Sequence, residues 1–308
     1  MVNKEYLAKW IEEYLFENSS IFQKLLSFLL FHLTVVYCFL AFLKKSFNLS
    51  YIPRIPVISI GNLTVGGSGK TPVTIELAKK YQKSAVVLRG YKRKSKGLVV
   101  IKDWERILCG VDVSGDEAML YAKALKNSLV IVCEKREIAI EKAYSMGAKV
   151  VFLDDGHSKY HIKKMDILIK PFPEPANKFC LPSGAYRASY KEYKSADLII
   201  DEKSDIKRKT IVSNPTEKMV LVTAIAKPKR LDEFLPKVCA KVYFEDHHFF
   251  TKNELEEILK KYDAASILCT GKDAVKMEGF GLKLSVLELD IELKKDIKIA
   301  VDAYIKDY

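Results

Sequence analysis

A glycine-rich segment between an apolar run and a helical pattern is the part of the sequence best suited to chemistry. It follows the apolar residues 57–60 and reads Gly61-Asn62-Leu63-Thr64-Val65-Gly66-Gly67-Ser68-Gly69-Lys70-Thr71-Pro72. Glycines allow several backbone N–H groups to close around phosphate oxygens, and the N-terminus of the following helix adds positive potential. The lysine can reach the outer phosphates, and the threonine hydroxyl can reach Mg²⁺. The segment therefore predicts a site for a nucleoside triphosphate.

The spacing of this segment resembles the Walker A phosphate loop, with one departure. The strict pattern G-x-x-x-x-G-K-[ST] places a glycine five residues before Gly69, where this chain has Thr64. Gly66 and Gly67 supply the flexibility instead, and Pro72 suits the first turn of a helix because its missing N–H costs nothing there. An ordinary glycine turn is the alternative explanation. The residues predicted to bind the nucleotide are Thr64, Val65, Gly66, Gly67, Ser68, Gly69, Lys70 and Thr71.

ATP is the nucleotide that the sequence favours. A GTPase of the Ras class would also carry the guanine-binding motif N-K-x-D. The nearest approach to that motif is Thr270-Gly271-Lys272-Asp273, in which the spacing is wrong.

A pair of acidic residues is placed to hold Mg²⁺ beside this loop. Asp154 and Asp155 follow an apolar strand pattern at 149–153 and precede a glycine. Carboxylates at strand ends near the phosphate loop are what a Mg²⁺-dependent phosphoryl transfer needs. Turn formation is the plainer explanation for an Asp-Gly sequence after a strand. Together with a phosphate loop, the pair predicts a magnesium site that includes Thr71.

A second acidic pair, Asp116-Glu117, follows Gly115 at a predicted helix start. Acidic residues in the first turn also stabilise a helix electrostatically, which is the alternative explanation. The pair is a second candidate for carboxylates beside the phosphate loop, and we predict Glu117 as a further magnesium ligand.

The chain is strongly basic, with 51 Lys and Arg residues against 39 Asp and Glu residues and a net charge of +12. This excess predicts an anionic partner: nucleic acid, anionic lipid or a phosphorylated substrate. Residues 89–96 carry five of the cations. Such a run is usually a solvated loop, but after a strand it can also contact a phosphate or lipid headgroups. No aromatic platform or nucleic-acid-binding module accompanies it, so nucleic acid is not predicted as a partner.

Alternating strand and helix patterns indicate the elements that position these residues. Buried strands are predicted at 57–60, 85–88, 129–133, 149–153 and 197–200, and helices near 72–83, 115–125 and 136–146. This order is typical of an α/β fold of the P-loop NTPase kind, in which a mostly parallel sheet carries helices on both faces. We interpret the charged stretch 201–217 as a linker. A second set of strand patterns, with helices at 230–237 and 252–261, predicts a smaller C-terminal α/β domain.

The N-terminus predicts a hydrophobic membrane helix that either spans the bilayer or lies in its surface. Nineteen uncharged residues, 25–43, lie between Lys24 and Lys44, and as a helix they would span ~28 Å, close to the thickness of the hydrocarbon core. A buried core helix is the main alternative; a secretory signal peptide is disfavoured because the run begins late and has no cleavage site. Cations after the run would keep the rest of the chain in the cytoplasm. The predicted domains are 1–50, 51–216 and 217–308.

The composition agrees with an ordered globular protein. Hydrophobic residues make up 49% and charged residues 29% of the chain, which excludes disorder, collagen and coiled coil. Six cysteines are scattered without a C-x-x-C pair, so reduced thiols are expected rather than a disulfide framework or a zinc ribbon.

Taken together, the motifs resemble the tetraacyldisaccharide 4′-kinase family, the lipid A 4′-kinases. The resemblance rests on the order of Gly61–Pro72, Arg89-Gly90-Tyr91, Gly115-Asp116-Glu117, Asp154-Asp155-Gly156, Leu181-Pro182-Ser183-Gly184 with Arg187, and Phe244-Glu245-Asp246-His247. It covers about residues 50 to 276, and the N-terminal hydrophobic segment also fits the family pattern.

The resemblance implies transfer of the γ-phosphate of ATP, with Mg²⁺, to the 4′-hydroxyl of a tetraacylated glucosamine disaccharide 1-phosphate. By position, Asp116 resembles the general base of the family and His247 the histidine that pairs with it. The resemblance implies contacts with the acceptor or phosphates for Arg89, Tyr91, Arg136 and Arg187. It places the enzyme on the cytoplasmic face of the bacterial inner membrane and implies no protein partner.

The chain departs from the family in two places, and two other functions compete. Family members usually have Phe-Gln-His-Arg after the Asp-Asp-Gly sequence, where this chain has His157-Ser158-Lys159, and Arg-Glu-Pro where it has Arg187-Ala188-Ser189. The rivals are a membrane-tethered regulatory NTPase and a P-loop kinase for a soluble metabolite.

Overall fold

The computed structural model describes residues 4–46, 50–67, 69–225, 228–246 and 248–308. Its larger sheet has seven strands in the order β3-β4-β2-β5-β1-β6-β7. The strands are β1 (Val57–Asn62), β2 (Ser84–Leu88), β3 (Val99–Lys102), β4 (Leu129–Val132), β5 (Val150–Asp154), β6 (Met165–Lys170) and β7 (Leu198–Asp201). All pair in parallel except β3, which runs antiparallel to β4. Every residue of β1, β2, β4 and β5 is buried, which is why these strands read as continuous apolar runs.

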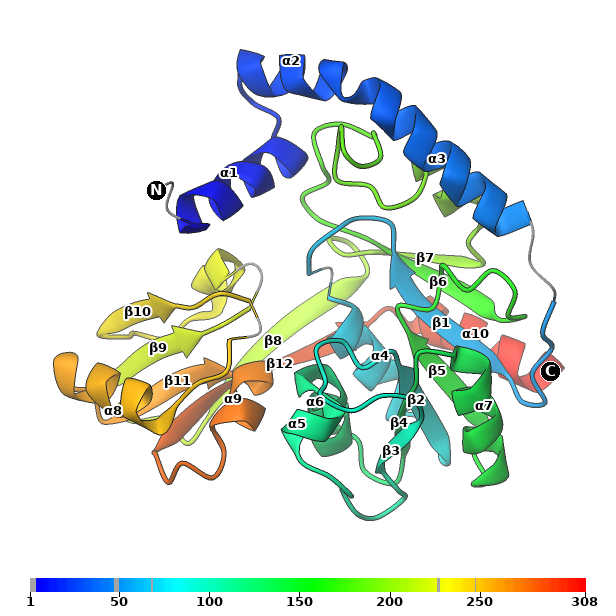
Figure 1. Ribbon diagram of the computed structural model, residues 1–308. Coiled ribbons are helices and arrows are strands. Elements are labelled where there is room, and N and C mark those ends of the chain that lie inside the picture. The colour runs from blue at the N-terminus through cyan, green and yellow to red at the C-terminus, as the bar shows by residue number, and fades with distance from the viewer. Residues whose placement is uncertain (1–3, 47–49, 68, 226–227, 247) are drawn as a thin grey trace.

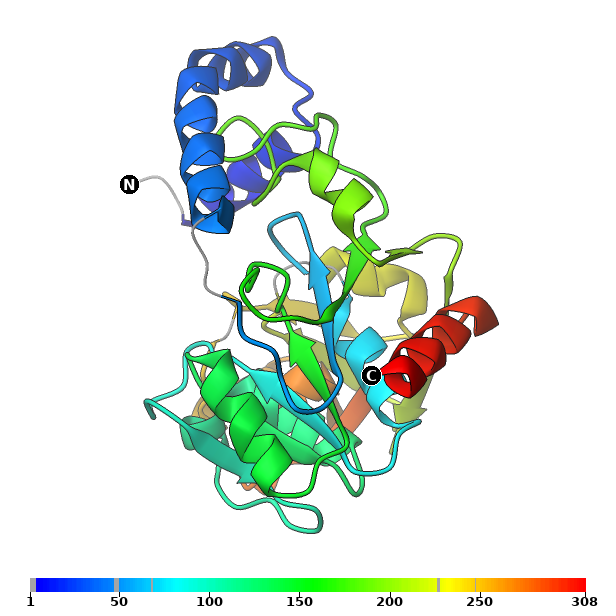
Figure 2. The same ribbon diagram turned by 90° about the vertical axis from the view of Figure 1, so that its right-hand side faces the viewer.

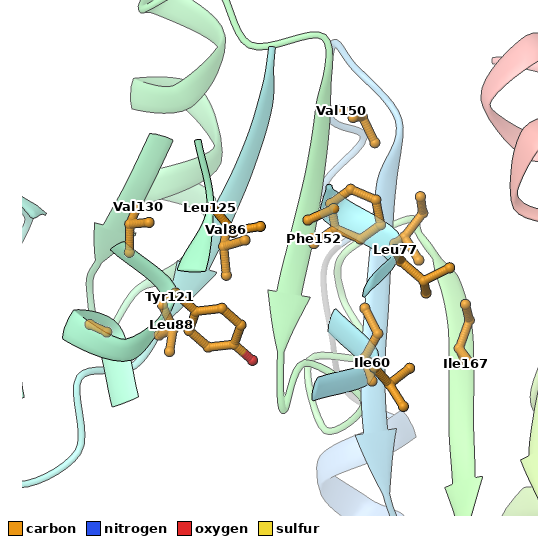
Figure 3. Close-up of a cluster of buried hydrophobic side chains, with 14 of the residues drawn as sticks. Ile60, Leu77, Val86, Leu88, Tyr121, Leu125, Val130, Val150, Phe152 and Ile167 are labelled. Atoms are coloured by element: carbon orange, nitrogen blue, oxygen red, sulfur yellow. The ribbon is translucent and has the colours of Figure 1, made fainter. Parts of the chain in front are cut away.

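Helices cover both faces of this sheet. The helices α4 (Lys70–Ala78), α6 (Asp116–Ala124) and α10 (Lys295–Asp307) pack on one face, and α7 (Arg136–Ser145) packs on the other. Figure 3 shows Leu77 of α4 and Tyr121 of α6 in one buried cluster with Phe152 of β5. Burial of each such side chain contributes about 1.5–3 kcal/mol. The predicted α/β fold, with a mostly parallel sheet covered on both faces, is confirmed.

A second sheet lies beside the first (Figure 1) and has the strand order β10-β9-β11-β12-β8. Its elements are β8 (Ile206–Ser213), β9 (Met219–Thr223), η2 (Pro228–Phe234), β10 (Ala240–Tyr243), α8 (Lys252–Lys261), β11 (Ser266–Thr270), α9 (Gly271–Met277) and β12 (Leu284–Leu293). The strands are parallel except for β8, which runs antiparallel to β12 over its full length. The helix expected at 230–237 is instead the short 3₁₀ segment η2.

The interpretation of 201–217 as a linker is wrong over 206–213, because these residues form β8. Strand β8 is an edge strand, and most of its side chains are partly or fully exposed. Edge strands commonly carry charged residues that prevent pairing with another chain. The Lys-Arg-Lys sequence at 207–209 therefore resembles a linker in composition although it is part of a sheet.

The chain passes between the two sheets twice. It enters the second sheet at β8 and returns after β12, so that α10 packs on the first sheet (Figure 1). Within α10, Lys298 and Asp302 form ion pairs with Glu76 and Lys80 respectively, on or next to α4. We refer below to residues 50–201 with 295–307 as the first unit and to residues 206–293 as the second unit. The sequence-based division instead placed the end of one domain at residue 216.

Three N-terminal helices lie along one end of the first unit (Figure 2): α1 (Lys4–Phe16), α2 (Ile21–Leu29) and α3 (Phe31–Ser46). The expected continuous helix over 25–43 is wrong, because the chain bends by 51° between α2 and α3. At the bend, the carbonyl of Ser27 accepts a hydrogen bond from the Ser183 hydroxyl, 2.8 Å away. Among the described residues no single helix has the length and apolarity to cross a membrane, whereas the bent pair together meets both criteria.

Candidate active site

The predicted functional residues gather at the carboxyl-terminal edge of the first sheet. Strands β1 and β5 are parallel neighbours, with Ile60 opposite Asp154. The glycine-rich loop after β1 and the acidic pair at the end of β5 therefore leave the sheet side by side. Ligands of open α/β sheets bind outside the carboxyl ends of the strands.

The glycine-rich loop has the backbone that its composition predicts. Gly66 and Gly69 have φ values of 85° and 71°, a region that favours glycine. Gly69 is the N-cap of α4, so Lys70 and the hydroxyl of Thr71 stand at the helix start. The N–H of Val65 donates to the carbonyl of Ala185 at 2.9 Å and is thus engaged within the protein.

Thr64 of the predicted nucleotide loop is engaged within the protein. Thr64 is buried, and its carbonyl and hydroxyl accept hydrogen bonds from the Asn62 amide at 2.8 and 3.1 Å. Ser68 lies outside the described residues. Within the described part of the loop, Gly66, Gly67 and Gly69 with the start of α4 stay the candidates for binding phosphate.

Asn62 organises the cations of the site. Its side-chain oxygen accepts hydrogen bonds from Lys70 Nζ at 2.9 Å and from Arg187 Nη2 at 2.7 Å. Arg187 also forms a two-pronged ion pair with Asp155, with distances of 3.0 and 2.8 Å. Lys70 Nζ lies 3.8 Å from Asp155 Oδ1. The pKa of Asp155 is lowered to about 2 against the opposing effect of burial, because Arg187 bonds to the carboxylate and Lys70 lies beside it.

The pKa of Asp154 is shifted in the opposite direction, upward. Burial, followed by the charge of Glu117, raises the pKa of this carboxyl to about 7, although Lys70 and Lys272 act in the opposite direction. Its Oδ1 atom is buried and has no hydrogen-bond partner in the described part of the chain. A buried, unsatisfied carboxylate beside a second carboxylate suits a divalent cation.

The described residues contain no cluster of three His, Cys, Asp or Glu side chains that could hold a metal ion. Mg²⁺ is usually bound by one or two carboxylates together with substrate phosphates, and the magnesium site stays a prediction. The predicted ligands differ in the contacts that they already make. Asp155 is engaged by Arg187 and Glu117 by Lys272, whereas Asp154 Oδ1 has no hydrogen-bond partner among the described residues.

The side chains predicted to bind the acceptor differ in their exposure to solvent. Arg136 is buried, its Nη1 donates to the carbonyl of Cys133 at 2.6 Å, and burial lowers its pKa although Asp154 and Asp155 act in the opposite direction. Arg89 is exposed at the end of β2. Tyr91 is 58% exposed on the loop that follows. These positions leave Arg89 and Tyr91 accessible to an acceptor and place Arg136 closer to the acidic pair.

Asp116 is the first residue of α6, and it lies where the first unit contacts the second. Its carboxylate accepts a hydrogen bond from the N–H of Glu117, and its Oδ2 lies 3.9 Å from Lys276 Nζ of α9. Lys272, also on α9, donates to Glu117 at 2.7 Å. His247 lies outside the described residues, so its pairing with Asp116 stays a prediction.

Three residues of this site were not predicted from the sequence. In the sequence, Asn62 is visible only as part of the loop motif Gly61–Pro72. Lys272 is visible only within the stretch that fails to match the guanine motif. Lys276 gave a signal that was missed, because it is a lysine between the buried residues Val275 and Met277.

Comparison with known proteins identifies the family. The family model described as "Tetraacyldisaccharide-1-P 4'-kinase" matches residues 22–306. The chain belongs to the tetraacyldisaccharide 4′-kinase family. It is 48% identical to a tetraacyldisaccharide 4′-kinase from Aliarcobacter butzleri, over 99% of both chains. It is also 47% identical to such kinases from Campylobacter jejuni and Helicobacter pylori, over 97% of this chain and 96% of theirs.

A solved kinase of the family has the same fold. The crystal structure of LpxK from Aquifex aeolicus, described as a complex with ATP, matches with a TM-score of 0.74 at 24% identity and covers 91% of this chain and 99% of that one. The family resemblance stated from the motifs is thus confirmed.

His157, where the chain departs from the usual family sequence, has a structural environment of its own. Its Nε2 lies 2.8 Å from Glu192 and its Nδ1 lies 3.6 Å from Asp166. A Cβ atom added to Gly61 would lie 2.9 Å from His157 Cβ, so the phosphate loop and the segment after β5 pack closely. The two carboxylates raise the pKa of His157 although burial, the largest single influence, acts to lower it.

Proposed function

We propose that this protein transfers the γ-phosphate of ATP to the 4′-hydroxyl of a tetraacylated glucosamine disaccharide 1-phosphate, a step of lipid A biosynthesis. Membership of the tetraacyldisaccharide 4′-kinase family supports this activity. The observation in the site that carries it is that the glycine-rich loop and Asp154 follow neighbouring strands, β1 and β5, while a separate carboxylate, Asp116, acts together with Asp154 on Lys272. Against the opposing effect of burial, Glu117, Asp116 and Asp154 raise the pKa of Lys272. The separate carboxylate favours a kinase, because a hydroxyl nucleophile needs a proton acceptor.

Each group in the site has a task in this reaction. The N–H groups of the loop and Lys70 bind the phosphates, and Asp116 accepts the proton of the attacking hydroxyl. Arg187 holds Asn62 and Asp155 in place and thereby positions Lys70. Mg²⁺ beside Asp154, Glu117 and Thr71 would neutralise charge on the phosphates. His247 completes the proposal as the partner of Asp116.

We also propose that α2 and α3 lie on the cytoplasmic surface of the inner membrane, where they meet the acyl chains of the acceptor. Apolar side chains on these helices that are 58–86% exposed are Ile21, Phe22, Phe28, Phe39, Leu40 and Phe42. The protein-facing side is polar: Ser27 donates to the carbonyl of Ser183, and Thr34 donates to the carbonyl of Cys180. Apolar residues outside and polar residues inside are the reverse of a soluble surface helix, and they suit a helix in a lipid interface.

Phosphoryl transfer from radiolabelled ATP tests the function. The protein is incubated with Mg²⁺, ATP and the tetraacylated disaccharide 1-phosphate in detergent micelles, and a parallel reaction has no lipid. The expected result is lipid-dependent formation of a bisphosphorylated product, with little release of inorganic phosphate to water. Phosphate release that does not depend on lipid would favour the regulatory NTPase instead.

A further inference from the structure

A small cavity lies between the two units beside Asp116. Its volume is about 10 Å³, and its lining residues are Lys92, Val111, Gly115, Asp116, Phe249 and Lys276. A cavity of this size has room for one water-sized oxygen atom. Its charged walls include Asp116 from the first unit and Lys276 from the second.

The ammonium group of Lys276 is buried without a hydrogen-bond acceptor. The Lys276 side chain is 3% exposed, and within the described ranges its Nζ has no hydrogen-bond partner. The carboxylate oxygens beside it are Asp273 Oδ1 at 3.4 Å and Asp116 Oδ2 at 3.9 Å. A charge-assisted N–H···O bond is typically 2.7–2.9 Å long. A buried charged donor with unmade hydrogen bonds is costly, so a further acceptor is expected in the cavity.

Asp273 is not free to move toward this ammonium group. Its Oδ2 accepts hydrogen bonds from the hydroxyls of Thr223 and Thr270, at 2.6 and 2.7 Å. Its Oδ1 accepts from the N–H of Ala224 at 3.1 Å. The ring of Phe250, whose centroid is 5.3 Å from Lys276 Nζ, closes another side. Lys276 is therefore held in place with donor capacity directed at the cavity it shares with Asp116.

We propose that this cavity seats the acceptor hydroxyl and that Lys276 donates a hydrogen bond to the hydroxyl oxygen while the hydroxyl donates to Asp116. The inference rests on the proposed function and adds Lys276 to its catalytic residues. A hydroxyl has one hydrogen to donate and lone pairs that accept, which matches a carboxylate wall and an ammonium wall. Val111 and Phe249 on the rim offer apolar contacts to the C–H groups of a sugar ring.

In the transfer step, Asp116 and Lys276 are the only side chains that need to act on the hydroxyl. The hydroxyl oxygen forms a bond to the γ-phosphorus while the bond from that phosphorus to the β–γ bridging oxygen breaks. ADP leaves with the electron pair, the hydroxyl proton passes to Asp116, and Lys276 keeps its protons. Lys276 thus fixes the direction of the hydroxyl before transfer, which is a contribution of orientation.

Ligand binding tests this assignment without relying on turnover. The affinity of the tetraacylated glucosamine disaccharide 1-phosphate is compared with that of its 4′-deoxy analogue, by calorimetry in detergent micelles. The wild type is expected to bind the hydroxyl ligand about tenfold more tightly or better, because the analogue leaves a charged donor unpaired. In Lys276→Met this preference should fall below about twofold, whereas Lys276→Arg should retain most of it.

The matched control is Lys123→Met. Lys123 forms an ion pair with Glu278 across the same contact between the units but does not line the cavity. This variant should keep the wild-type preference. A preference retained in Lys276→Met, or lost equally in Lys123→Met, would overturn the assignment, because the effect would then belong to the interface in general.

Wild-type protein provides a second measurement if Lys276→Met does not fold. With ζ-¹⁵N-labelled lysine, the Lys276 signal, assigned from Lys276→Arg, should shift on adding the hydroxyl ligand and remain in place with the 4′-deoxy ligand. Equal shifts would refute the inference. If the wild type phosphorylates the lipid but binds both ligands equally, only this inference fails; if it neither binds nor phosphorylates the lipid, the proposed function fails and this inference with it.

Discussion

Replacing Asp154 with Asn should stabilise the ligand-free protein, although the residue is proposed to be essential for turnover. The pKa of this buried carboxyl is raised from 3.8 to about 7, chiefly by burial. Above pH 7 the group is ionised in both folded and unfolded chains, and the folded state bears a cost of about 1.4 kcal/mol per pKa unit. A shift of about three units therefore corresponds to at most ~4 kcal/mol.

The pH dependence fixes the sign of the effect. Below pH 3.8 the carboxyl is protonated in both states and contributes nothing. Between this pH and about 7 the folded state binds more protons than the unfolded state, so stability falls as the pH rises. The cost is about 1.5 kcal/mol at pH 5 and about 4 kcal/mol at pH 8. The advantage of Asp154→Asn over the wild type should therefore be about 2–3 kcal/mol larger at pH 8 than at pH 5.

Urea unfolding at these two pH values measures the difference. Trp104 reports on the first unit, because it packs against a core of the first sheet and donates to the carbonyl of Met146 at 3.1 Å. The variants are made in a Trp10→Phe background, so that Trp104 is the only tryptophan that fluoresces. Parallel pH dependences for Asp154→Asn and the wild type would refute the reasoning, as would a variant that loses stability more strongly at pH 8.

Asp155→Asn is the matched control, because the pKa of Asp155 is lowered whereas that of Asp154 is raised. Its carboxylate has a pKa lowered to about 2 because Arg187 and Lys70 lie beside it. The stability from this depressed pKa is present above the unfolded value of 3.8 and is lost only as the pH falls toward 2. Asp155→Asn should therefore be destabilised to a similar degree at pH 5 and pH 8. Adding ATP with Mg²⁺ at pH 8 should stabilise the wild type more than Asp154→Asn.

Three further results are expected. Lys70→Ala should lower turnover by orders of magnitude with an unchanged circular dichroism spectrum, because a cation is lost from the phosphate site; near-normal turnover would remove the phosphate-loop assignment. The full-length protein should sediment with membranes and a chain without residues 1–44 should not; unfolding of the shortened chain, with a soluble full-length protein, would favour a buried-helix role. Asp116→Asn and His247→Ala should each cut transfer to lipid by ~10²-fold or more at nearly unchanged ATP affinity, and the double variant should be little worse than the poorer single one; additive losses would show that the two residues do not act as a pair.

Local signals in the sequence predicted the glycine-rich loop and five of the seven strands of the first sheet, but neither β3 nor β6. A parallel strand buried on both faces has to be apolar throughout, so β1, β2, β4 and β5 are visible as runs of apolar residues. The loop is likewise local, since the glycines, Lys70 and Thr71 act within one turn of the same helix start.

Features that depend on a contact with a residue far away in the chain could not be predicted from the sequence. Strand β8 has an exposed, alternating pattern and is recognisable only through its pairing with β12. At the bend between α2 and α3, the carbonyl of Ser27 accepts a hydrogen bond from Ser183, which is more than 150 residues away in the chain. Apolarity predicted a helix over 25–43, but it carries no information on contacts with a remote loop.

The proposed role of Lys276 depends on a distant partner in the same way. Lys272 and Lys276 of α9 form ion pairs with Glu117 and Asp116 only because the second unit packs against α6. A lysine between Val275 and Met277 on a short helix is unexpected in a buried segment, because a buried ammonium group must be paired. Asp273 and Asp116 form ion pairs with its Nζ at 3.4 and 3.9 Å, but among the described residues Nζ makes no hydrogen bond. Lysine is rarely buried, so a lysine in a buried segment points to a functional contact. For the proposed acceptor site, the buried Lys276 is therefore a more informative signal than the spacing of the sequence motifs.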